Sequence, residues 1–378
     1  MRNWLPVYST VGAGFGFGTS RPLAQYAEIF AGRRFVALSE SGKWIFNRET
    51  ARDTTAIEQE FAMLTLLADD AGIAATPKDP DQADELFDFA PRMLQAASGK
   101  PYALVDGGLW TARNYLEAEE TFDWRNLTWR ENHCFLAGQT LARFHRWGAK
   151  MKAASPTKLS CLRPEVDYET VCIRRLSEQI GDLPQAKSAH LIHCLQKALS
   201  DAGKTAQSYS PIHGDFHPGN VLFSKGSVRA VIDWDFSRLG DLLFDLAYAR
   251  LMFAGKFRDV RLQSAVGEID PELQALFHLD LLAAFEKGYY SRQFEGASAG
   301  LRQVCPLPLS AASTKNNAVP AQELDLPLAL RSRTVLVMAL ILAFEMEEFK
   351  SQSYAPVERK NRAAIIENLF DDFSCLSC

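Results

Sequence analysis

The sequence lacks a hydrophobic run long enough to cross a membrane. Its longest apolar run, residues 335–344, is well short of the roughly 20 residues that a membrane-spanning helix needs. We expect this run to belong to a buried helix near the C-terminus. The N-terminal residues include Arg2 and several glycines but no continuous apolar segment of the kind found in secretory signals. These two absences predict a cytoplasmic protein.

The sequence also lacks a surplus of basic residues and a regular cysteine pattern. Its formal net charge of -5 does not favour nucleic acid or an anionic membrane as a partner, because both attract basic surfaces. The seven cysteines are scattered, and Cys375 and Cys378 have no second pair or nearby histidine with which to bind zinc. We therefore expect reduced thiols, as in a cytoplasm.

The first third of the chain predicts a small sheet with one helix. Residues 34–38 and 44–48 are rich in strand-forming side chains and flank a turn-forming segment, so they predict an antiparallel hairpin. Apolar residues then recur at helical spacing from Ile57 to Ala68. Two more predicted strands, residues 102–105 and 110–116, are separated by an Asp-Gly-Gly turn.

The rest of the chain is mainly helical. A helical pattern begins at residue 129, and further patterns cover residues 168–180, 188–202, 271–292 and 331–349. Residues 296–322 are rich in Gly, Pro, Ser and Asn, and we interpret them as a flexible surface loop rather than an active-site loop. At 378 residues the chain can form two lobes, which we predict as residues 1–116 and 117–378.

The strongest chemical pattern lies in residues 210–250. Two short apolar runs joined by a Lys-Gly turn predict a hairpin that brings Asn220 and Asp233 close together at its mouth. Amide and carboxylate oxygens are ligands that Mg²⁺ prefers. Asp215 precedes Asn220 by five residues, so a loop can place a third carboxylate beside the metal without making it a ligand.

These residues have the spacing of a kinase catalytic loop. His213, Asp215 and Asn220 fit the pattern His-x-Asp-x-x-x-x-Asn, and Asp233 fits the later magnesium-binding aspartate. Phosphoryl transfer mainly needs alignment of a hydroxyl and neutralisation of phosphate charge, so this small set is sufficient. The alternative, two polar turns around a hairpin, leaves the agreement of several spacings unexplained. We therefore predict a phosphotransferase that uses ATP and Mg²⁺.

The same residues resemble a known family. The runs are IHGDFHPGNVLF and VIDWDFSRLGDLLFDLA, and they resemble the signature of the aminoglycoside phosphotransferase and choline kinase superfamily. This superfamily also includes homoserine, methylthioribose and N-acetylhexosamine kinases. The resemblance implies an α+β, two-lobed protein-kinase-like fold, with a small antiparallel sheet in the first lobe and a mainly helical second lobe. It also implies a small-molecule hydroxyl acceptor.

The resemblance implies a role for each residue of the motif. Asp215 would orient the acceptor hydroxyl and act as the base, and His217 would lie near the γ-phosphate. Asn220 and Asp233 would bind Mg²⁺, with Asp235 as a neighbouring or second-metal carboxylate. His213, Asp241 and Asp245 would support the site, and we expect Asp241 and Asp245 to brace the catalytic loop by hydrogen bonds rather than to touch substrate. His145 would be a packed helix residue rather than a catalytic one.

The resemblance is weaker in the predicted first lobe. A kinase of this type needs a cation on the third strand for the α- and β-phosphates and a glutamate on the next helix to orient it. Glu60 has the expected place on the helix, but the strand lacks the usual lysine. N-acetylhexosamine 1-kinases are similar in carrying a Gln-Arg pair there, which favours Arg48 after Asn47, with Lys43 in reserve.

Other nucleotide contacts are predicted from position. The predicted junction of the lobes consists of Tyr115, Leu116 and Glu117. The backbone of this junction would hydrogen-bond adenine. Residues 31–33 are the in-register candidate for a glycine lid. Residues 12–18 resemble a dinucleotide fingerprint, but no predicted strand precedes them and no predicted helix opens inside them. We interpret residues 12–18 as a mobile N-terminal segment.

The acceptor is left open by the sequence. The segment DGGLWTARNYLE resembles N-acetylhexosamine 1-kinases and favours a sugar or aminosugar. The loop HGDFHPGN is closer to the aminoglycoside and homoserine kinases, and favours an aminoglycoside or an amino alcohol. The missing strand lysine keeps a nucleotide-binding pseudokinase or regulatory protein as an alternative. A protein kinase is disfavoured, because the sequence has no recognisable DFG-to-APE activation segment.

Overall fold

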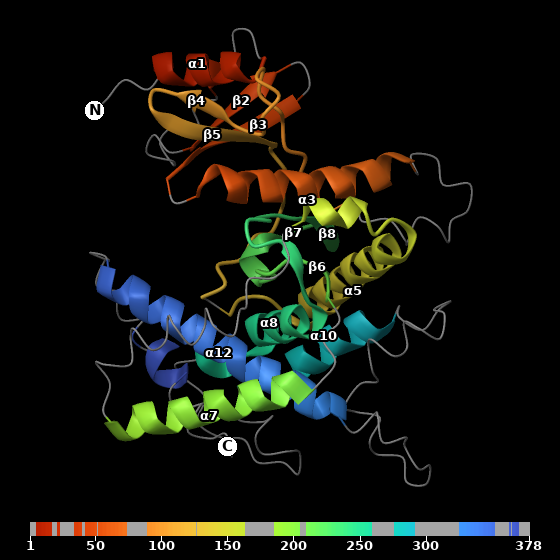
Figure 1. Ribbon diagram of the computed structural model, residues 1–378, viewed down its shortest axis with the longest axis vertical. Helices are drawn as coiled ribbons and strands as arrows, with labels where there is room; N and C mark the ends of the chain where they lie inside the picture. The colour runs from red at the N-terminus through yellow and green to blue at the C-terminus, as the bar shows by residue number, and fades with distance from the viewer. Residues whose placement is uncertain are drawn as a thin grey trace. The chain divides into compact units, whose positions relative to one another are not determined.

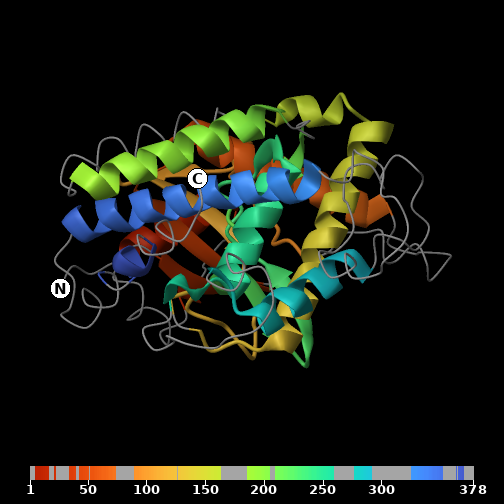
Figure 2. The ribbon, with the colours of Figure 1, turned by 90° about the horizontal axis from the view of Figure 1, so that it is seen from below.

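A computed structural model describes the fold, which is shown from two sides in Figure 1 and Figure 2. The described residues are 5–16, 21–22, 34–39, 42–50, 52–73, 89–125, 127–162, 185–204, 209–258, 276–291, 325–351, 363 and 365–369. They form two compact units. The first unit comprises Met1–Thr121, Lys150–Arg163 and Asn220–Arg238, and the second comprises Phe122–Ala149, Pro164–Gly219 and Leu239–Cys378. The lobe boundary between residues 116 and 117 stays a prediction.

The first unit contains a five-stranded antiparallel sheet with the order β1-β2-β3-β5-β4. The strands are β1 (Arg21–Pro22), β2 (Arg34–Ser39), β3 (Gly42–Glu49), β4 (Ala103–Val105) and β5 (Gly108–Asn114). Both predicted hairpins are confirmed. The β4–β5 turn places Asp106 and Gly107 at φ angles of 50° and 68°, a two-residue geometry that the Asp-Gly pair favours.

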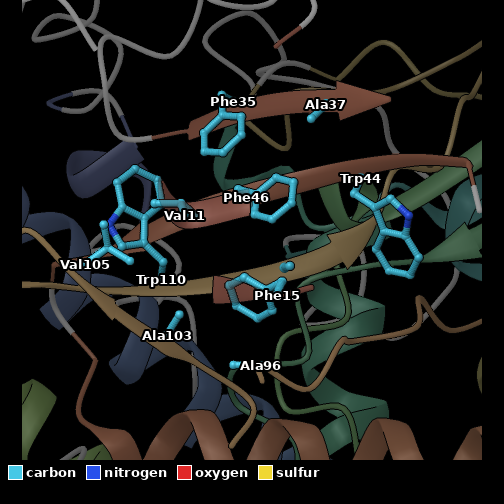
Figure 3. Packing of buried hydrophobic residues seen from close by; sticks show 11 residues of the cluster. Val11, Phe15, Phe35, Ala37, Trp44, Phe46, Ala96, Ala103, Val105 and Trp110 are labelled. Atoms are coloured by element: carbon cyan, nitrogen blue, oxygen red, sulfur yellow. The ribbon is translucent and has the colours of Figure 1, made fainter. Parts of the chain in front are cut away.

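One face of this sheet carries a hydrophobic core. Alternate residues of four strands, β2 to β5, point to this face, among them Phe35, Phe46 and Trp110, and Figure 3 shows them packed together. Helix α1 (Leu5–Gly14) contributes Val11, and the turn after it contributes Phe15, whose ring centroid lies 5.7 Å from that of Phe46.

The prediction of a mobile segment at residues 12–18 is wrong for residues 12–16. Residues 12–14 form the end of α1, and Phe15 is buried. The apolar spacing of Val11 and Phe15 is a helical signal that the surrounding glycines obscured. Residues 17 and 18 lie outside the described ranges, as do the lid candidate at residues 31–33 and the loop at residues 296–322.

Helix α3 (Thr54–Ile73) and a third hairpin complete the main elements of the first unit. The side chain of Asp53 accepts a hydrogen bond from the backbone N–H of Ala56 and caps the start of α3. The hairpin consists of β7 (Val221–Ser224) and β8 (Ser227–Val231). Its turn residues Lys225 and Gly226 have φ angles of 51° and 71°, so the predicted hairpin and its turn are confirmed.

The second unit is mainly helical. Its described helices are α5 (Glu131–Ala154), whose last residues group with the first unit, α7 (Gln185–Lys204), α8 (Leu242–Ala254), α10 (Leu279–Ser291) and α12 (Asp325–Ser351). Strands β6 (Tyr209–Ile212) and β9 (Arg238–Asp241) pair, and short 3-10 helices lie at Pro218–Asn220 and Lys256–Arg258. A further 3-10 helix, Lys158–Cys161, belongs to the first unit. The predicted helix at residues 168–180 lies outside the described residues.

Helix α8 lies at the centre of the second unit. All of its residues are buried, and it packs against α12 and α10. Helix α12 also packs against α7, and the two are seen side by side in Figure 2. The predicted buried helix near the C-terminus is therefore confirmed. In the part of the chain that the structure describes, no helix combines the length and apolarity needed to span a membrane.

The cysteines differ from the prediction in one place. Cys134 and Cys161 are free thiols, as expected, but Cys194 is in a disulfide. The prediction that every thiol is reduced is therefore wrong for Cys194. Irregular cysteine spacing does not reveal this bond, because a disulfide depends on distance in the fold rather than in the sequence.

Candidate active site

The predicted site residues belong to both units. Asp215 and His217 lie in the second unit, on the loop between β6 and the 3-10 helix Pro218–Asn220. Asn220, Asp233 and Asp235 group with the first unit, although we predicted them in the second lobe. The reason is the β7–β8 hairpin. The backbone of β7 bonds to residues 119 and 120, and that of β8 bonds to residue 89.

Asp215 is positioned as an ionised carboxylate. Its Oδ1 accepts a hydrogen bond of 2.5 Å from the hydroxyl of Tyr248, and its Oδ2 lies 3.5 Å from Nε2 of His217. Burial raises the pKa of Asp215, but His217 and Tyr248 lower it by more, so the pKa lies below its ordinary value. A fifth of the side chain remains exposed. Asp215 is thus charged at neutral pH and accessible to a hydroxyl group.

His217 is held in one tautomer. Its Nδ1 accepts a hydrogen bond of 3.0 Å from the backbone N–H of Gly219, so the neutral ring carries its proton on Nε2, which faces Asp215. Gly219 allows this close approach, because a Cβ atom there would lie 2.9 Å from Cε1 of His217. The predicted partners Asp215 and His217 are therefore neighbours with complementary acceptor and donor atoms.

Asp245 of α8 binds the backbone of the loop that carries Asp215. Its wholly buried carboxylate accepts hydrogen bonds from the backbone N–H groups of His213 (3.1 Å) and Gly214 (2.9 Å), and lies 3.0 Å from Nε2 of His145. Burial raises the pKa of Asp245, but these partners lower it below its ordinary value. Nδ1 of His145 in turn lies 2.7 Å from the hydroxyl of Tyr289.

Asp241 has different partners from those predicted. Its side chain caps α8 by accepting a hydrogen bond from the backbone N–H of Leu243, and it also binds Nε of Arg333 at 2.8 Å. Both side chains of this ion pair are buried. The hydrogen bonds of Asp241 that the structure describes thus join α8 to α12, and none of them reaches the catalytic loop.

Glu60 is the centre of a buried ion-pair network in the first unit. Both oxygens of its wholly buried carboxylate bind Arg113 of β5, with an Nε to Oε1 distance of 2.8 Å. Arg52, between β3 and α3, donates to Oε2 at 2.8 Å. Burial raises the pKa of Glu60, but the two arginines lower it below its ordinary value. Glu49 joins the network through the hydroxyl of Thr111, which donates to it at 2.6 Å.

The prediction that Glu60 orients Arg48 is wrong, because the two residues belong to different faces of the sheet. Strand residues alternate, and Arg48 shares its face with Trp44 and Phe46 of the hydrophobic core. Its guanidinium lies against Gly108 of β5. A role of Arg48 in nucleotide binding stays a prediction, and its position does not favour it. Sequence reasoning missed Arg52 and Arg113, although the alternation of β5 places Arg113 and Thr111 on one face.

Asp235 is attached to the same network. Its Oδ1 lies 2.8 Å from Nη1 of Arg52 and 3.5 Å from Nη2 of Arg113. Burial, together with the charges of Glu60 and Asp233, raises the pKa of Asp235 despite the arginines. A carboxylate that is bound to two arginines is not arranged as a metal ligand, so the metal role that we predicted for Asp235 is not favoured by this arrangement.

Asn220 and Asp233 lie at the same end of the β7–β8 hairpin. The backbone carbonyl of Asn220 accepts a hydrogen bond of 2.8 Å from the N–H of Ile232, which confirms the predicted proximity of the two segments. Asp233 has a φ of 63°, an uncommon value for a residue with a side chain. Within the described ranges, no three His, Cys, Asp or Glu side chains gather as a metal site. One amide and one carboxylate still fit Mg²⁺, which takes further ligands from water and phosphate.

The predicted adenine linker is bonded to Lys43 of strand β3. The backbone N–H of Tyr115 donates to the carbonyl of Lys43 at 2.8 Å, and the ammonium of Lys43 forms an ion pair with Glu117. Leu116, which lies between Tyr115 and Glu117 in the sequence, is partly buried. Lys43, which we considered as a reserve cation for phosphate, is thus engaged with the linker.

Comparisons with known sequences agree with this arrangement. Residues 25–283 match the family described as phosphotransferase enzyme family. A homoserine kinase of Granulibacter bethesdensis is 33% identical over 122 residues, which are 31% of this chain and 35% of that protein. A homoserine kinase of Nitrobacter hamburgensis is 28% identical over 158 residues, 41% of each. The matches thus span well under half the length of these curated relatives.

Solved structures show the same fold. An amicoumacin kinase in complex with AMP-PNP and Ca²⁺ has a TM-score of 0.57 and 15% identity, covering 98% of this chain and 94% of that one. A microcompartment-associated aminopropanol kinase has a TM-score of 0.56 and 13% identity, covering 98% and 95%. A spectinomycin phosphotransferase with AMP has a TM-score of 0.54 and 13% identity, covering all of both chains. The predicted α+β, two-lobed protein-kinase-like fold is confirmed.

Proposed function

Because this chain belongs to the phosphotransferase enzyme family, as its motifs predicted, we propose that it is an ATP- and Mg²⁺-dependent kinase of a small molecule. It moves the γ-phosphate of ATP to a hydroxyl group of the acceptor. The similar structures include complexes with AMP-PNP, with ADP and with GDP, which support a nucleotide as the donor, and we propose ATP.

The observation that carries this proposal is the environment of Asp215. Tyr248 and His217 offer it hydrogen bonds, and its pKa lies below its ordinary value. An ionised carboxylate on a fixed loop can orient an acceptor hydroxyl and receive its proton as the oxygen attacks phosphorus. Asp245 prevents the loop from moving, because it binds two successive backbone N–H groups.

The remaining residues of the motif serve the phosphates in this proposal. Asn220 and Asp233 hold Mg²⁺ at the open end of the hairpin, and the metal neutralises phosphate charge when it is bound. His217 keeps its Nε2 proton directed at Asp215 and so fixes the orientation of that carboxylate. Residues 115–117 contact the adenine through their backbone, as in other kinases of this architecture.

An amine-bearing alcohol is the acceptor class that the relatives favour. The curated relatives are homoserine kinases, and one similar structure is an aminopropanol kinase. The sugar or aminosugar acceptor has less support, because two residues of the segment that suggested it have structural roles. Trp110 is buried in the core, and Arg113 binds Glu60. We propose a cytoplasmic location and no nucleic acid or membrane partner, as the charge and hydropathy predict.

A nucleotide-binding pseudokinase is the second candidate. The observation in its favour is that β3 supplies no cation to Glu60, whose carboxylate binds Arg52 and Arg113 instead. A pseudokinase of this kind binds ATP without transferring phosphate.

The test is phosphate transfer from ATP and Mg²⁺ to a panel of acceptors, with Asp215→Asn as the key variant. The panel contains homoserine, aminopropanol, choline, aminosugars and aminoglycosides. We expect transfer to at least one acceptor, reduced at least a hundredfold in Asp215→Asn, which is in the range typical of a lost general base. The affinity for AMP-PNP should change by less than about twofold.

Asp280→Asn is the matched control, because Asp280 is an exposed aspartate in the first turn of α10. Full activity of Asp215→Asn would exclude Asp215 as the base. Binding of AMP-PNP without transfer to any acceptor would favour the pseudokinase.

A further inference from the structure

The third strand cannot supply a phosphate-binding cation next to Glu60. Of its basic residues, Arg48 shares the core face with Phe46. Lys43 is on the other face, but it is engaged with Glu117. Asn47, at the middle of that face, is uncharged. The cation that Glu60 orients must therefore come from another element.

Arg52 is in the position that such a cation needs. It lies just after β3, and its Nη2 donates to Glu60 at 2.8 Å and to the carbonyl of Ala56 at 3.3 Å. Its Nη1 lies 2.8 Å from Asp235, two residues after the predicted metal ligand Asp233. Arg52 thus connects the helix glutamate to the segment that carries the metal ligand, and its ion pair with Glu60 corresponds to the lysine–glutamate ion pair of other kinases.

Arg52 also has an unused donor. Its Nε is buried and has no hydrogen-bond partner among the described residues. A buried N–H without a partner costs free energy and requires an explanation, of which a bound water or anion is one. Arg113 differs in this respect, because its Nε and Nη2 bind Glu60 and its Nη1 binds Thr111. Arg113 fixes Glu60, whereas Arg52 retains capacity to bind an anion.

We propose that Arg52 replaces the missing strand lysine and binds the α- and β-phosphates of the nucleotide, oriented by Glu60. This inference rests on the proposed kinase function and names its phosphate-binding residue. In this structure a carboxylate oxygen of Asp235 lies next to Nη1 of Arg52. In the proposed nucleotide complex a phosphate oxygen replaces it. Arginine suits this exchange, because its planar fork binds carboxylate and phosphate with the same geometry.

The experiment compares binding of ATP and of adenosine to the full chain by titration calorimetry. Adenosine has no phosphates, so a phosphate-binding residue affects ATP alone, whereas a misfolded variant loses both. We expect Arg52→Ala to weaken ATP at least tenfold and to leave adenosine within twofold. Arg52→Lys keeps the charge but not the planar guanidinium, so its ATP affinity should lie between those of Arg52→Ala and the wild type. Arg92→Ala, at an exposed arginine of the first unit, is the matched control.

A second variant tests the exchange itself. With EDTA present and no Mg²⁺, Asp235→Asn should bind ATP more tightly than the wild type, because an asparagine competes less well than an aspartate for Nη1 of Arg52. Unchanged ATP affinity in Arg52→Ala, or an equal loss of ATP and adenosine, would overturn the inference and leave the proposed function intact. A wild-type chain that bound neither ATP nor adenosine would overturn both.

Discussion

The hydroxyl of Tyr248 donates a hydrogen bond to Oδ1 of Asp215, and Tyr248 lies three residues after Asp245 on helix α8. Residues three apart share one side of a helix. Two residues on one side of α8 therefore bind this loop. Asp245 accepts hydrogen bonds from the loop backbone, and Tyr248 donates one to the carboxylate of Asp215. The ionisation of Asp215 thus depends on a residue outside the recognised motif.

Tyr248→Phe should move the pH dependence of phosphate transfer. Loss of the hydroxyl removes a partner that lowers the pKa of Asp215, so this pKa rises toward its ordinary value. Because the base must be ionised, the acid limb of the kcat/KM profile should shift to higher pH. The measurement is the profile from about pH 2.5 to 7, which includes the ordinary pKa of an aspartate, with Tyr290→Phe on α10 as a control. An acid limb at the same pH in Tyr248→Phe would show that this hydrogen bond does not tune the base.

Asp245→Asn should destabilise the protein by about 3 kcal/mol at neutral pH, as is typical when a buried charged group loses its interactions. The folded-state pKa of Asp245 is lowered, so its contribution is present above the unfolded pKa of about 4 and is lost as the pH falls below it. The difference between wild type and variant in urea unfolding should therefore shrink in acid. A difference in unfolding free energy that stays constant down to the acid transition would contradict the lowered pKa of Asp245 in the folded protein.

Arg333→Met should also destabilise the second unit by about 3 kcal/mol, because Asp241 remains buried without its cation. Adding Asp241→Asn should restore part of this loss. Asparagine caps a helix about as well as aspartate, so the double variant keeps the cap of α8 and removes only the unpaired charge. Denaturant unfolding of the two single variants and the double variant measures the coupling. Additive losses would mean that the two side chains act independently.

Arg48→Ala should leave the affinity for ATP within about twofold of the wild type. The guanidinium of Arg48 lies against Gly108 on the core face of the sheet, away from the face of Glu60 and Thr111. Calorimetric titration with ATP checks this. A tenfold loss of affinity, with adenosine binding unchanged, would restore Arg48 as the phosphate ligand and weaken the case for Arg52.

The sequence predicted well the features that depend on neighbouring residues. All three hairpins of the first unit were found because alternation and turn residues are local signals, and the turn at Lys225 and Gly226 has the expected geometry. The spacing of Asp215 and Asn220 likewise selected the loop for which we propose a catalytic role. Helix α1 was missed because its glycines outweighed the apolar spacing of Val11 and Phe15.

The partners of Glu60 were not predictable in the same way. Arg113 is 53 residues from Glu60, and their contact depends on how α3 packs over the sheet. Sequence spacing favoured Arg48, the arginine of β3 that relatives suggest, but strand alternation assigns it to the opposite face. Consideration of the face as well as the strand would have excluded Arg48 as the partner of Glu60 and drawn attention to Arg52 and Arg113.

The complete burial of α8 has a consequence for engineering. Every position from Leu242 to Ala254 packs against other side chains, so a library directed at this helix has no surface site where a change costs little. Selection for a new acceptor would therefore enrich replacements elsewhere, while α8 would tolerate only replacements of similar volume. A saturation library should show this helix as one of the least permissive segments, with most replacements reducing protein abundance and with position 248 also affecting catalysis through Asp215.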